Sequence, residues 1–177
     1  MPTEAATLRH GVAVLALSCL AAPVAAAELT VQVTLPALNT ASYYRPYLAA
    51  WVEKDADRAS VGTLAVWYDM KLRDNLGRGW LRNLRTWWRG DGARLALPID
   101  GVSGATRPAG THTLHFAAGH PLLAGLPAGR YQLAVEVARE QGNRELVRVP
   151  FDWGGGPNAA RVDGSNELER VSVSVAP

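Results

Sequence analysis

The chain has 177 residues, of which 48% are hydrophobic and 19% are charged, and its formal net charge at pH 7 is +2. This length suits one domain with a single core, and so mild a positive charge does not favour nucleic acid as a partner. The only cysteine, Cys19, lies in an N-terminal apolar run. The rest of the chain therefore has no residue for a disulfide, a thiolate metal site or a cysteine nucleophile.

The N-terminal segment is typical of a secretory signal peptide. Arg9 ends a short positive region, the apolar run GVAVLALSCLAAPVAAA follows it, and the small residues at 25–27 suit a cleavage site. We therefore expect a cleaved signal peptide over residues 1–27, a single domain over residues 28–177 and a periplasmic location. Lipid attachment at Cys19, within ALSC, is the alternative to ordinary cleavage. No other segment is long and apolar enough to span a bilayer, so no membrane span is expected in the mature chain.

Seven segments predict β-strands, because their residues alternate with a period of two or are rich in β-branched and aromatic side chains. They are residues 29–35, 47–52, 63–68, 111–116, 131–137, 146–151 and 171–175. Both faces of 47–52 are apolar, which predicts a central strand, and Pro150 predicts that 146–151 lies at an edge or ends there. The pattern is typical of an all-β fold, an immunoglobulin-like antiparallel β-sandwich. The stretch WGGGPNAARVDGSN, residues 153–166, is interpreted as a long loop.

Residues 76–90, LGRGWLRNLRTWWRG, interrupt the β pattern and predict one amphipathic crossover helix. Its apolar face consists of side chains that recur every four residues, namely Leu76, Trp80, Leu84 and Trp88. The opposite side carries Arg78, Arg82, Arg85 and Arg89. We expect the apolar face to cap the sandwich. The arginines are expected to form a docking face for an anionic cofactor phosphate, an acidic partner or the membrane surface.

No metal or catalytic site is predicted. His112 and His115 point to opposite faces of a strand, so they do not chelate one ion. Asp163, Asn166 and Glu167 lack the spacing of a calcium loop. No acid, base and nucleophile occur together with supporting context, which favours an electron carrier or accessory protein over an independent enzyme.

The segment DGVSGAT, residues 100–106, is the most specific short pattern in the chain. One interpretation is a polar turn between two strands. The other is an attachment point, with the Thr106 hydroxyl presented on a loop. Small neighbouring residues leave the backbone open to the approach of another protein, and a loop can reach into a foreign active site.

This pattern of Asp, two residues, Ser or Thr, Gly, Ala, and Ser or Thr resembles the flavinylation motif of FMN-binding domains, as in subunits of sodium-translocating NADH:quinone reductases. In those domains a flavin transferase joins the FMN phosphate to the final Thr or Ser through a phosphodiester. The resemblance implies covalent FMN on Thr106. The other motif positions are filled by Asp100, Ser103, Gly104 and Ala105. We expect Arg107 and the helix arginines to balance the charge of the phosphate.

A second resemblance covers most of the chain. The segments RPYLAAWVEKD, TLAVWY, WLRNLRTWWR and GRYQLAVEVARE are similar to a family of predicted periplasmic proteins of unknown function, found beside PepSY-domain membrane proteins and flavin transferases. It implies a periplasmic flavinylated electron-transfer protein that serves a membrane redox system. Its partners would be a flavin transferase and a PepSY-type or other membrane redox protein. The alternative is a non-catalytic module that binds a membrane partner or ligand, in which SGAT is only a turn.

Overall fold

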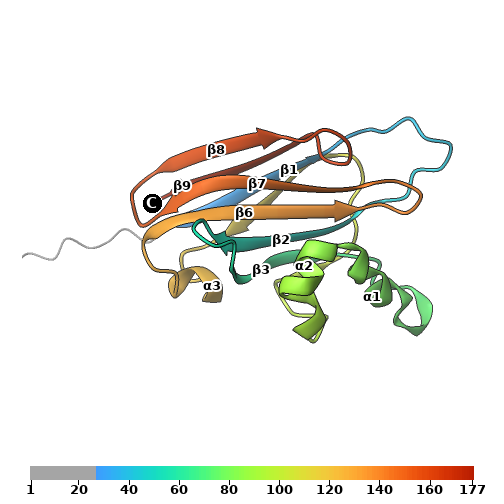
Figure 1. Cartoon of the computed structure of the whole chain (residues 1–177), viewed down its shortest axis with the longest axis horizontal. Coiled ribbons are helices and arrows are strands. Elements are labelled where there is room, and N and C mark those ends of the chain that lie inside the picture. The colour runs from blue at the N-terminus through green and yellow to red at the C-terminus, as the bar shows by residue number, and fades with distance from the viewer. Residues whose placement is uncertain (1–26) are drawn as a thin grey trace, which may run out of the picture.

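The structure is a computed structural model that describes residues 27–177, so the expected signal peptide and Cys19 lie outside the described residues, apart from Ala27. Within the described residues, nine β-strands form two stacked sheets, and a run of short helices lies against one of them (Figure 1). The strands are β1 Glu28–Leu35, β2 Tyr47–Lys54, β3 Ser60–Trp67, β4 Ser103–Gly104, β5 Gly110–Phe116, β6 Gly129–Ala138, β7 Arg144–Trp153, β8 Asn158–Asp163 and β9 Arg170–Ala176. The predicted all-β sandwich is confirmed.

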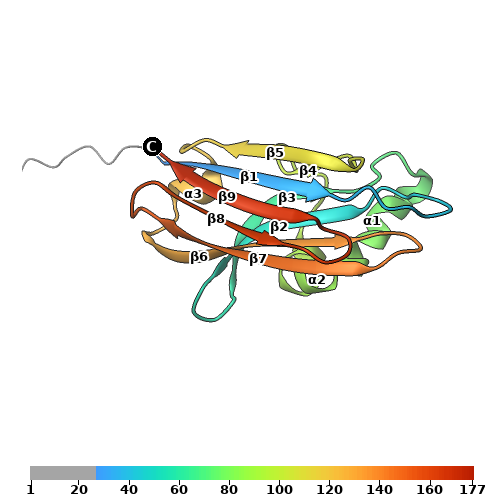
Figure 2. The same ribbon diagram turned by 90° about the horizontal axis from the view of Figure 1, so that it is seen from above.

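The two sheets have the orders β5–β1–β9–β8 and β4–β3–β2–β6–β7. All pairs are antiparallel except β3 and β4, which run parallel. Strands of the two sheets run in nearly the same direction (Figure 2), as in aligned sandwiches. β2 is central, as its two apolar faces predicted, and β7 is at the edge of its sheet, as Pro150 predicted.

The main core lies between the two sheets. In β1 the side chains of Leu29, Val31 and Val33 are fully buried, while the residues between them are half-buried or exposed. They belong to one apolar cluster with Leu48 and Val52 of β2 in the other sheet. The period-two alternation of the sequence therefore becomes the inward face of the sandwich.

A second, smaller core covers the outer face of the five-stranded sheet. Trp51 and Val66 project from that sheet and belong to one apolar cluster with Leu81, Leu84 and Trp87 of the helical segment. This covering layer explains why β2 is apolar on both faces.

The single helix predicted over residues 76–90 is wrong, because the segment breaks into short pieces. They are η1 Arg73–Asn75, α1 Leu76–Trp80, η2 Leu81–Asn83, α2 Arg85–Gly90 and η3 Gly92–Arg94, and a further short helix, α3, spans Pro121–Ala124. Leu84 interrupts the helical backbone with φ −77° and ψ 71°. The break rotates the second half of the segment relative to the first.

The break also changes which side chains are buried. Leu81, Leu84 and Trp87 are at most 1% exposed, whereas Leu76 and Trp80 of the predicted apolar face are 50% and 37% exposed. Trp87 therefore caps the sheet, with the half-buried Trp88 packed against the same core, and Trp80 faces solvent.

Two predicted loops contain strands. Residues 153–166 include β8, a half-exposed edge strand that pairs with β9. Its run of small and polar side chains lacks a strand signal, so backbone pairing rather than composition makes it a strand. In the DGVSGAT segment, Ser103 and Gly104 form β4 beside β3.

Candidate functional site

A cavity of about 1180 Å³ opens at the end of the sandwich opposite the C-terminus. Its walls come from the β1–β2 loop, the connection that follows β3, and the β6–β7 hairpin. Thr106, which follows β4, completes the lining. Loops at one end of a sandwich commonly carry its binding site.

The structure brings Thr106 together with part of the predicted docking face. Thr106 is half-buried and lines the cavity, as do Arg82, Arg85 and Trp80. These residues lie more than twenty positions from Thr106 in the sequence. The pairing of β4 with β3 and the packing of the helical segment on the same sheet bring them to one site.

Strand β4 fixes the position of Thr106. The Val66 amide donates to the Val102 carbonyl over 2.8 Å, and the Tyr68 amide donates to the Gly104 carbonyl over 3.0 Å. On the other side, the Ser103 hydroxyl accepts from the Ile99 amide over 2.9 Å and closes the preceding turn.

The remaining motif residues lie around this short strand. A Cβ on Gly104 would lie 3.4 Å from the Trp67 ring, so a small residue suits this position. Asp100 and Ala105 are exposed. The motif is therefore a turn and a two-residue edge strand, and only Thr106 among its residues lines the cavity.

The other predicted cations lie elsewhere. The Arg107 guanidinium stacks on Trp67, with Cζ 4.3 Å from the ring centroid. Arg78 donates to the Leu97 carbonyl over 3.4 Å. Arg78, Arg89 and Arg107 are not among the cavity-lining residues, so the predicted docking face divides into two pairs.

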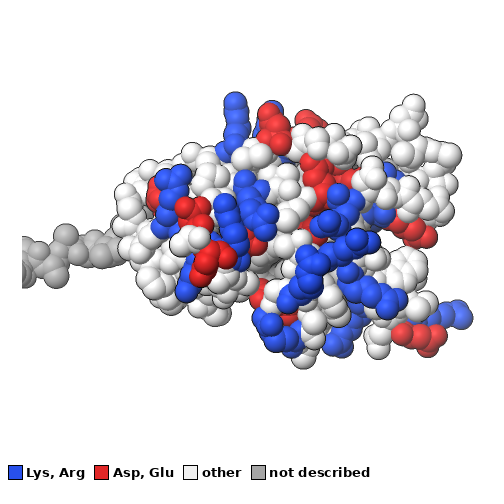
Figure 3. Space-filling model, viewed as in Figure 1, with Lys and Arg blue, Asp and Glu red and all other residues white. Residues whose placement is uncertain are grey.

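The cavity has cations that are available to an anion. Within residues 27–177, no carboxylate lies within 4.0 Å of Arg45, Arg82 or Arg85. Two further arginines of the lining are already paired, Arg139 with Glu167 and Arg144 with Glu136. The lining also includes the carboxylate of Asp69 and that of Glu140. Figure 3 shows Lys and Arg side chains gathered over the helical segment beside the cavity.

Two buried polar atoms of cavity-lining residues have no hydrogen-bond partner among the described residues, Tyr47 Oη and Arg139 Nη1. Burial raises the pKa of Tyr47 above its ordinary value, although the neighbouring Asp69 backbone partly offsets this effect, so its hydroxyl is protonated at neutral pH. The hydrogen bond to Glu167 raises the pKa of Arg139, which stays charged. Both atoms are therefore donors, and buried donors without partners favour a ligand that accepts from them.

Aromatic side chains line the same cavity. Tyr43, Tyr44 and Trp80 are 36%, 37% and 37% exposed. Burial raises the pKa of Tyr43, although the nearby Arg139 guanidinium partly offsets this effect, so the phenol is neutral. Exposed rings beside a cavity suit a planar ligand.

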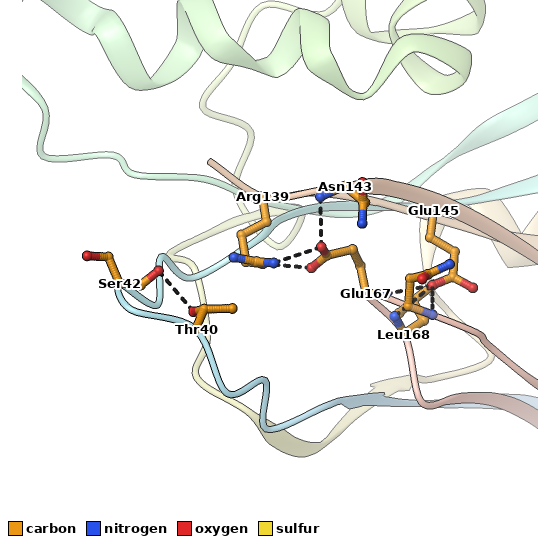
Figure 4. A network of polar contacts seen from close by, with 8 residues as sticks. Thr40, Ser42, Arg139, Asn143, Glu145, Glu167 and Leu168 are labelled. Atoms are coloured by element: carbon orange, nitrogen blue, oxygen red, sulfur yellow. Dashed lines mark hydrogen bonds and ion pairs between the residues drawn. The ribbon is translucent and has the colours of Figure 1, made fainter. Parts of the chain in front are cut away.

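Buried carboxylates hold the walls in place, and the sequence patterns did not predict them. Arg139 makes a bidentate pair with Glu167, with Nε–Oε2 at 2.8 Å, and the Asn143 amide donates to Glu167 Oε1 over 2.8 Å. In the same network, Glu145 accepts from the Leu168 amide over 3.0 Å (Figure 4). Glu136 is fully buried and accepts from the Trp87 amide over 2.9 Å. A glutamate within the apolar strand 131–137 was the available signal.

His112 and His115 each contact a polar atom of a neighbouring residue. His112 Nε2 lies 2.7 Å from the Pro108 carbonyl, and His115 Nδ1 lies 3.1 Å from the Thr30 hydroxyl. In residues 27–177 no three His, Cys, Asp or Glu side chains group together in a way that could hold a metal ion. Nor does this part of the chain contain a helix long and apolar enough to cross a membrane.

The fold and the cavity define a β-sandwich protein with a cationic and aromatic site at one end. The chain belongs to the family described as predicted periplasmic protein (DUF2271), whose family model matches residues 28–170. This membership supports the periplasmic location expected from the N-terminal segment. No curated protein and no solved structure matches the chain.

Proposed function

We propose that the protein is a periplasmic electron carrier in which FMN is joined covalently to Thr106. The observation that carries the proposal is the position of Thr106 in the same cavity as Trp80, Arg82 and Arg85. An attachment point needs a hydroxyl, and a tethered flavin needs a cation for its phosphate and an aromatic surface for its ring.

The residues of the cavity fit this cofactor. Arg82 and Arg85, which have no carboxylate partner in the described part of the chain, suit a phosphodiester. Trp80 and Tyr43 offer rings to a planar group. The unused donor at Tyr47 Oη is of the kind that the carbonyl oxygens of a flavin accept.

Attachment would require an activated flavin, and FAD, in which FMN is bound through a pyrophosphate, is such a donor. The Thr106 hydroxyl oxygen forms a bond to the FMN phosphorus while the pyrophosphate bond breaks. AMP leaves with the electron pair, and the hydroxyl proton passes to a base of the flavin transferase. The product is a phosphodiester, and no oxidant is consumed.

The short motif strand suits modification by a separate enzyme. Ala105 next to Thr106 is small and exposed, and the backbone from 105 to 108 belongs to no strand or helix. A transferase can therefore approach the acceptor without a bulky neighbour. The covalent bond also prevents loss of the cofactor outside the cytoplasm.

When attached, FMN supplies the redox chemistry, and the protein supplies tethering, orientation and electrostatics. Arg82 and Arg85 offset the negative charge of the phosphodiester. Trp80 shields the ring from water at the mouth of the cavity. A carrier of this kind serves a membrane redox system, in which a PepSY-type or other membrane protein exchanges electrons with it.

Intact mass spectrometry tests the proposal after co-expression of the exported chain with a flavin transferase. We expect the wild type and Thr106→Ser to gain the mass of one FMN less one water, because both keep a hydroxyl at the acceptor position. Thr106→Ala should gain nothing. Thr113→Ala, which removes an exposed hydroxyl from β5, is the matched control and should gain the full mass. An unmodified wild type, or a modified Thr106→Ala, would contradict the proposal.

A further inference from the structure

Large apolar side chains are exposed around the mouth of the cavity. Six such residues in the described chain are 36% to 50% exposed, and we name them the apolar rim: Tyr43, Tyr44, Met70, Leu72, Leu76 and Trp80. All six belong to two segments, 43–44 and 70–80. Tyr43, Tyr44, Leu72 and Trp80 line the cavity, and Met70 and Leu76 lie close to Leu72 in the sequence, so the rim lies at one end of the molecule. An apolar group of this kind that is bordered by charge marks an interaction site.

Positive charge is concentrated at the same end. Residues 70–94 carry seven Lys and Arg side chains against two Asp side chains, a net charge of +5, whereas the whole chain has a net charge of +2. The remainder of the chain is therefore net negative. Lys71 and Arg73 alternate with the rim residues Met70 and Leu72, and all four side chains are exposed. Figure 3 shows the blue side chains over this part of the molecule.

The shape of the rim favours a lipid surface over a protein surface. A stable protein interface needs a contiguous, well-packed patch of roughly 800 Å² on each partner. The rim instead lies beside the open cavity, where Met70 and Leu72 belong to the turn before α1 and Leu76 begins that helix. In Figure 1, α1 lies beyond the ends of the sheets. Lipid headgroups and acyl chains are fluid, so they can pack around apolar side chains that do not form one flat patch. Aliphatic and aromatic side chains mixed with Lys and Arg are the combination found at membrane interfaces.

We propose that the apolar rim and its neighbouring cations dock the protein on an anionic lipid bilayer. Met70, Leu72 and Leu76 enter the headgroup region, and Lys71 and Arg73 contact the anionic headgroups. Charge complementarity favours an anionic bilayer as the partner of these cations. The periplasm is bounded by membranes, so a periplasmic protein meets such a surface. Tyr43 and Trp80 of the rim are also assigned to the flavin ring. Met70, Lys71, Leu72, Arg73 and Leu76 are not, so docking through these five residues does not need the cofactor.

Docking in this way sets the orientation of the molecule. Four of the six rim residues line the cavity, and the C-terminus lies at the opposite end of the molecule. The cavity therefore opens toward the bilayer, which places Thr106 within reach of membrane-embedded redox partners without a membrane span in the described chain.

Vesicle flotation tests the docking with the Thr106→Ala chain, so that the result does not depend on flavin. The probes are vesicles of phosphatidylcholine alone and vesicles in which phosphatidylglycerol replaces one third of it. We expect binding to the anionic vesicles only, weakened by added salt. Leu72→Ser with Leu76→Ser should lower the partition coefficient by about tenfold or more, because each leucine loses its transfer from water.

Charge variants separate local contact from net charge. Lys71→Gln with Arg73→Gln should weaken binding, whereas the matched pair Lys54→Gln with Arg161→Gln, which removes the same charge from exposed strand positions, should not. An equal loss of vesicle binding in both double variants would overturn the proposal, as would unchanged binding by the variant with both leucines replaced. Absence of binding to anionic vesicles at low salt would also overturn it and would leave an acidic protein surface as the occupant of the rim.

Discussion

The absence of a side chain at Gly77 allows two backbone segments to approach closely at the start of the helical segment. It is buried in α1, and a Cβ at this position would lie 1.9 Å from the Asp69 carbonyl oxygen. Asp69 lines the cavity, so this close backbone approach also sets one cavity wall. Gly79, two residues later in the same helix, is exposed, and a Cβ at that position would meet no other atom within 4 Å.

Alanine at these two positions should therefore have opposite effects. Gly77→Ala forces the backbone apart and is expected to lower the free energy of unfolding by about 1–3 kcal/mol. Gly79→Ala removes backbone entropy from the unfolded chain and should raise it by up to about 1 kcal/mol. Urea unfolding followed by tryptophan fluorescence measures both. Equal effects of the two substitutions would show that the contact with Asp69 does not constrain the fold.

Glu145 organises the turn between β8 and β9. Its carboxylate accepts from the backbone amides of four successive residues, 165–168, at distances of 2.7 to 3.0 Å. Burial alone would raise the pKa of Glu145, but these four donors outweigh it, and the pKa lies below its ordinary value. Because Glu167 within this turn pairs with Arg139, the turn supports the cavity wall.

The lowered pKa gives the sign of a pH effect. A carboxyl with a lower pKa in the folded state stabilises it at pH values above the unfolded pKa, and this stability is lost as pH falls through the folded pKa. Glu145→Gln should lower the free energy of unfolding at neutral pH by about 1–2 kcal/mol, given its partial exposure. The difference in the free energy of unfolding between wild type and variant should disappear at acidic pH. Glu169→Gln, at an exposed glutamate nearby, is the control, and a gap that did not change with pH would refute this role.

The helical segment presents two pairs of arginines with different surroundings. Arg82 and Arg85 line the cavity, whereas Arg78 and Arg89 do not. Cations near a flavin stabilise its negatively charged reduced form, and their effect falls with distance. On the flavinylated protein, Arg82→Gln with Arg85→Gln should therefore lower the midpoint potential by tens of millivolts. Arg78→Gln with Arg89→Gln should leave it nearly unchanged. Equal shifts would mean that the flavin does not lie in this cavity.

At the scale of the whole molecule, the fold was largely predictable because its strands alternate. The repeat of buried and exposed residues in β1 and β9 belongs to the sequence itself. The helical segment was not predictable, because the Glu136 carboxylate from β6 accepts the first amides of α2 and allows a new helix to begin at Arg85. β8 was missed because its strand character comes from pairing with β9.

The cavity could be predicted only in part. The motif indicated Thr106 and the helix pattern indicated Arg82 and Arg85, each from local spacing. Their convergence depends on the parallel pairing of β3 with β4, which two residues make. Tyr47 and Arg139 had no local signal, since their unpartnered atoms follow from burial in the folded chain. Long-range topology, not residue type, assembles this site.

Peptide-level mass spectrometry of the protein purified from periplasm after co-expression with a flavin transferase tests the central claim most directly. Fragmentation of the flavin-bearing peptide locates the phosphodiester on one residue. We expect FMN on Thr106, with Ser103 unmodified because its hydroxyl closes the turn at Ile99. Flavin on any other residue, or a Thr106 peptide found only in its unmodified form, would contradict it.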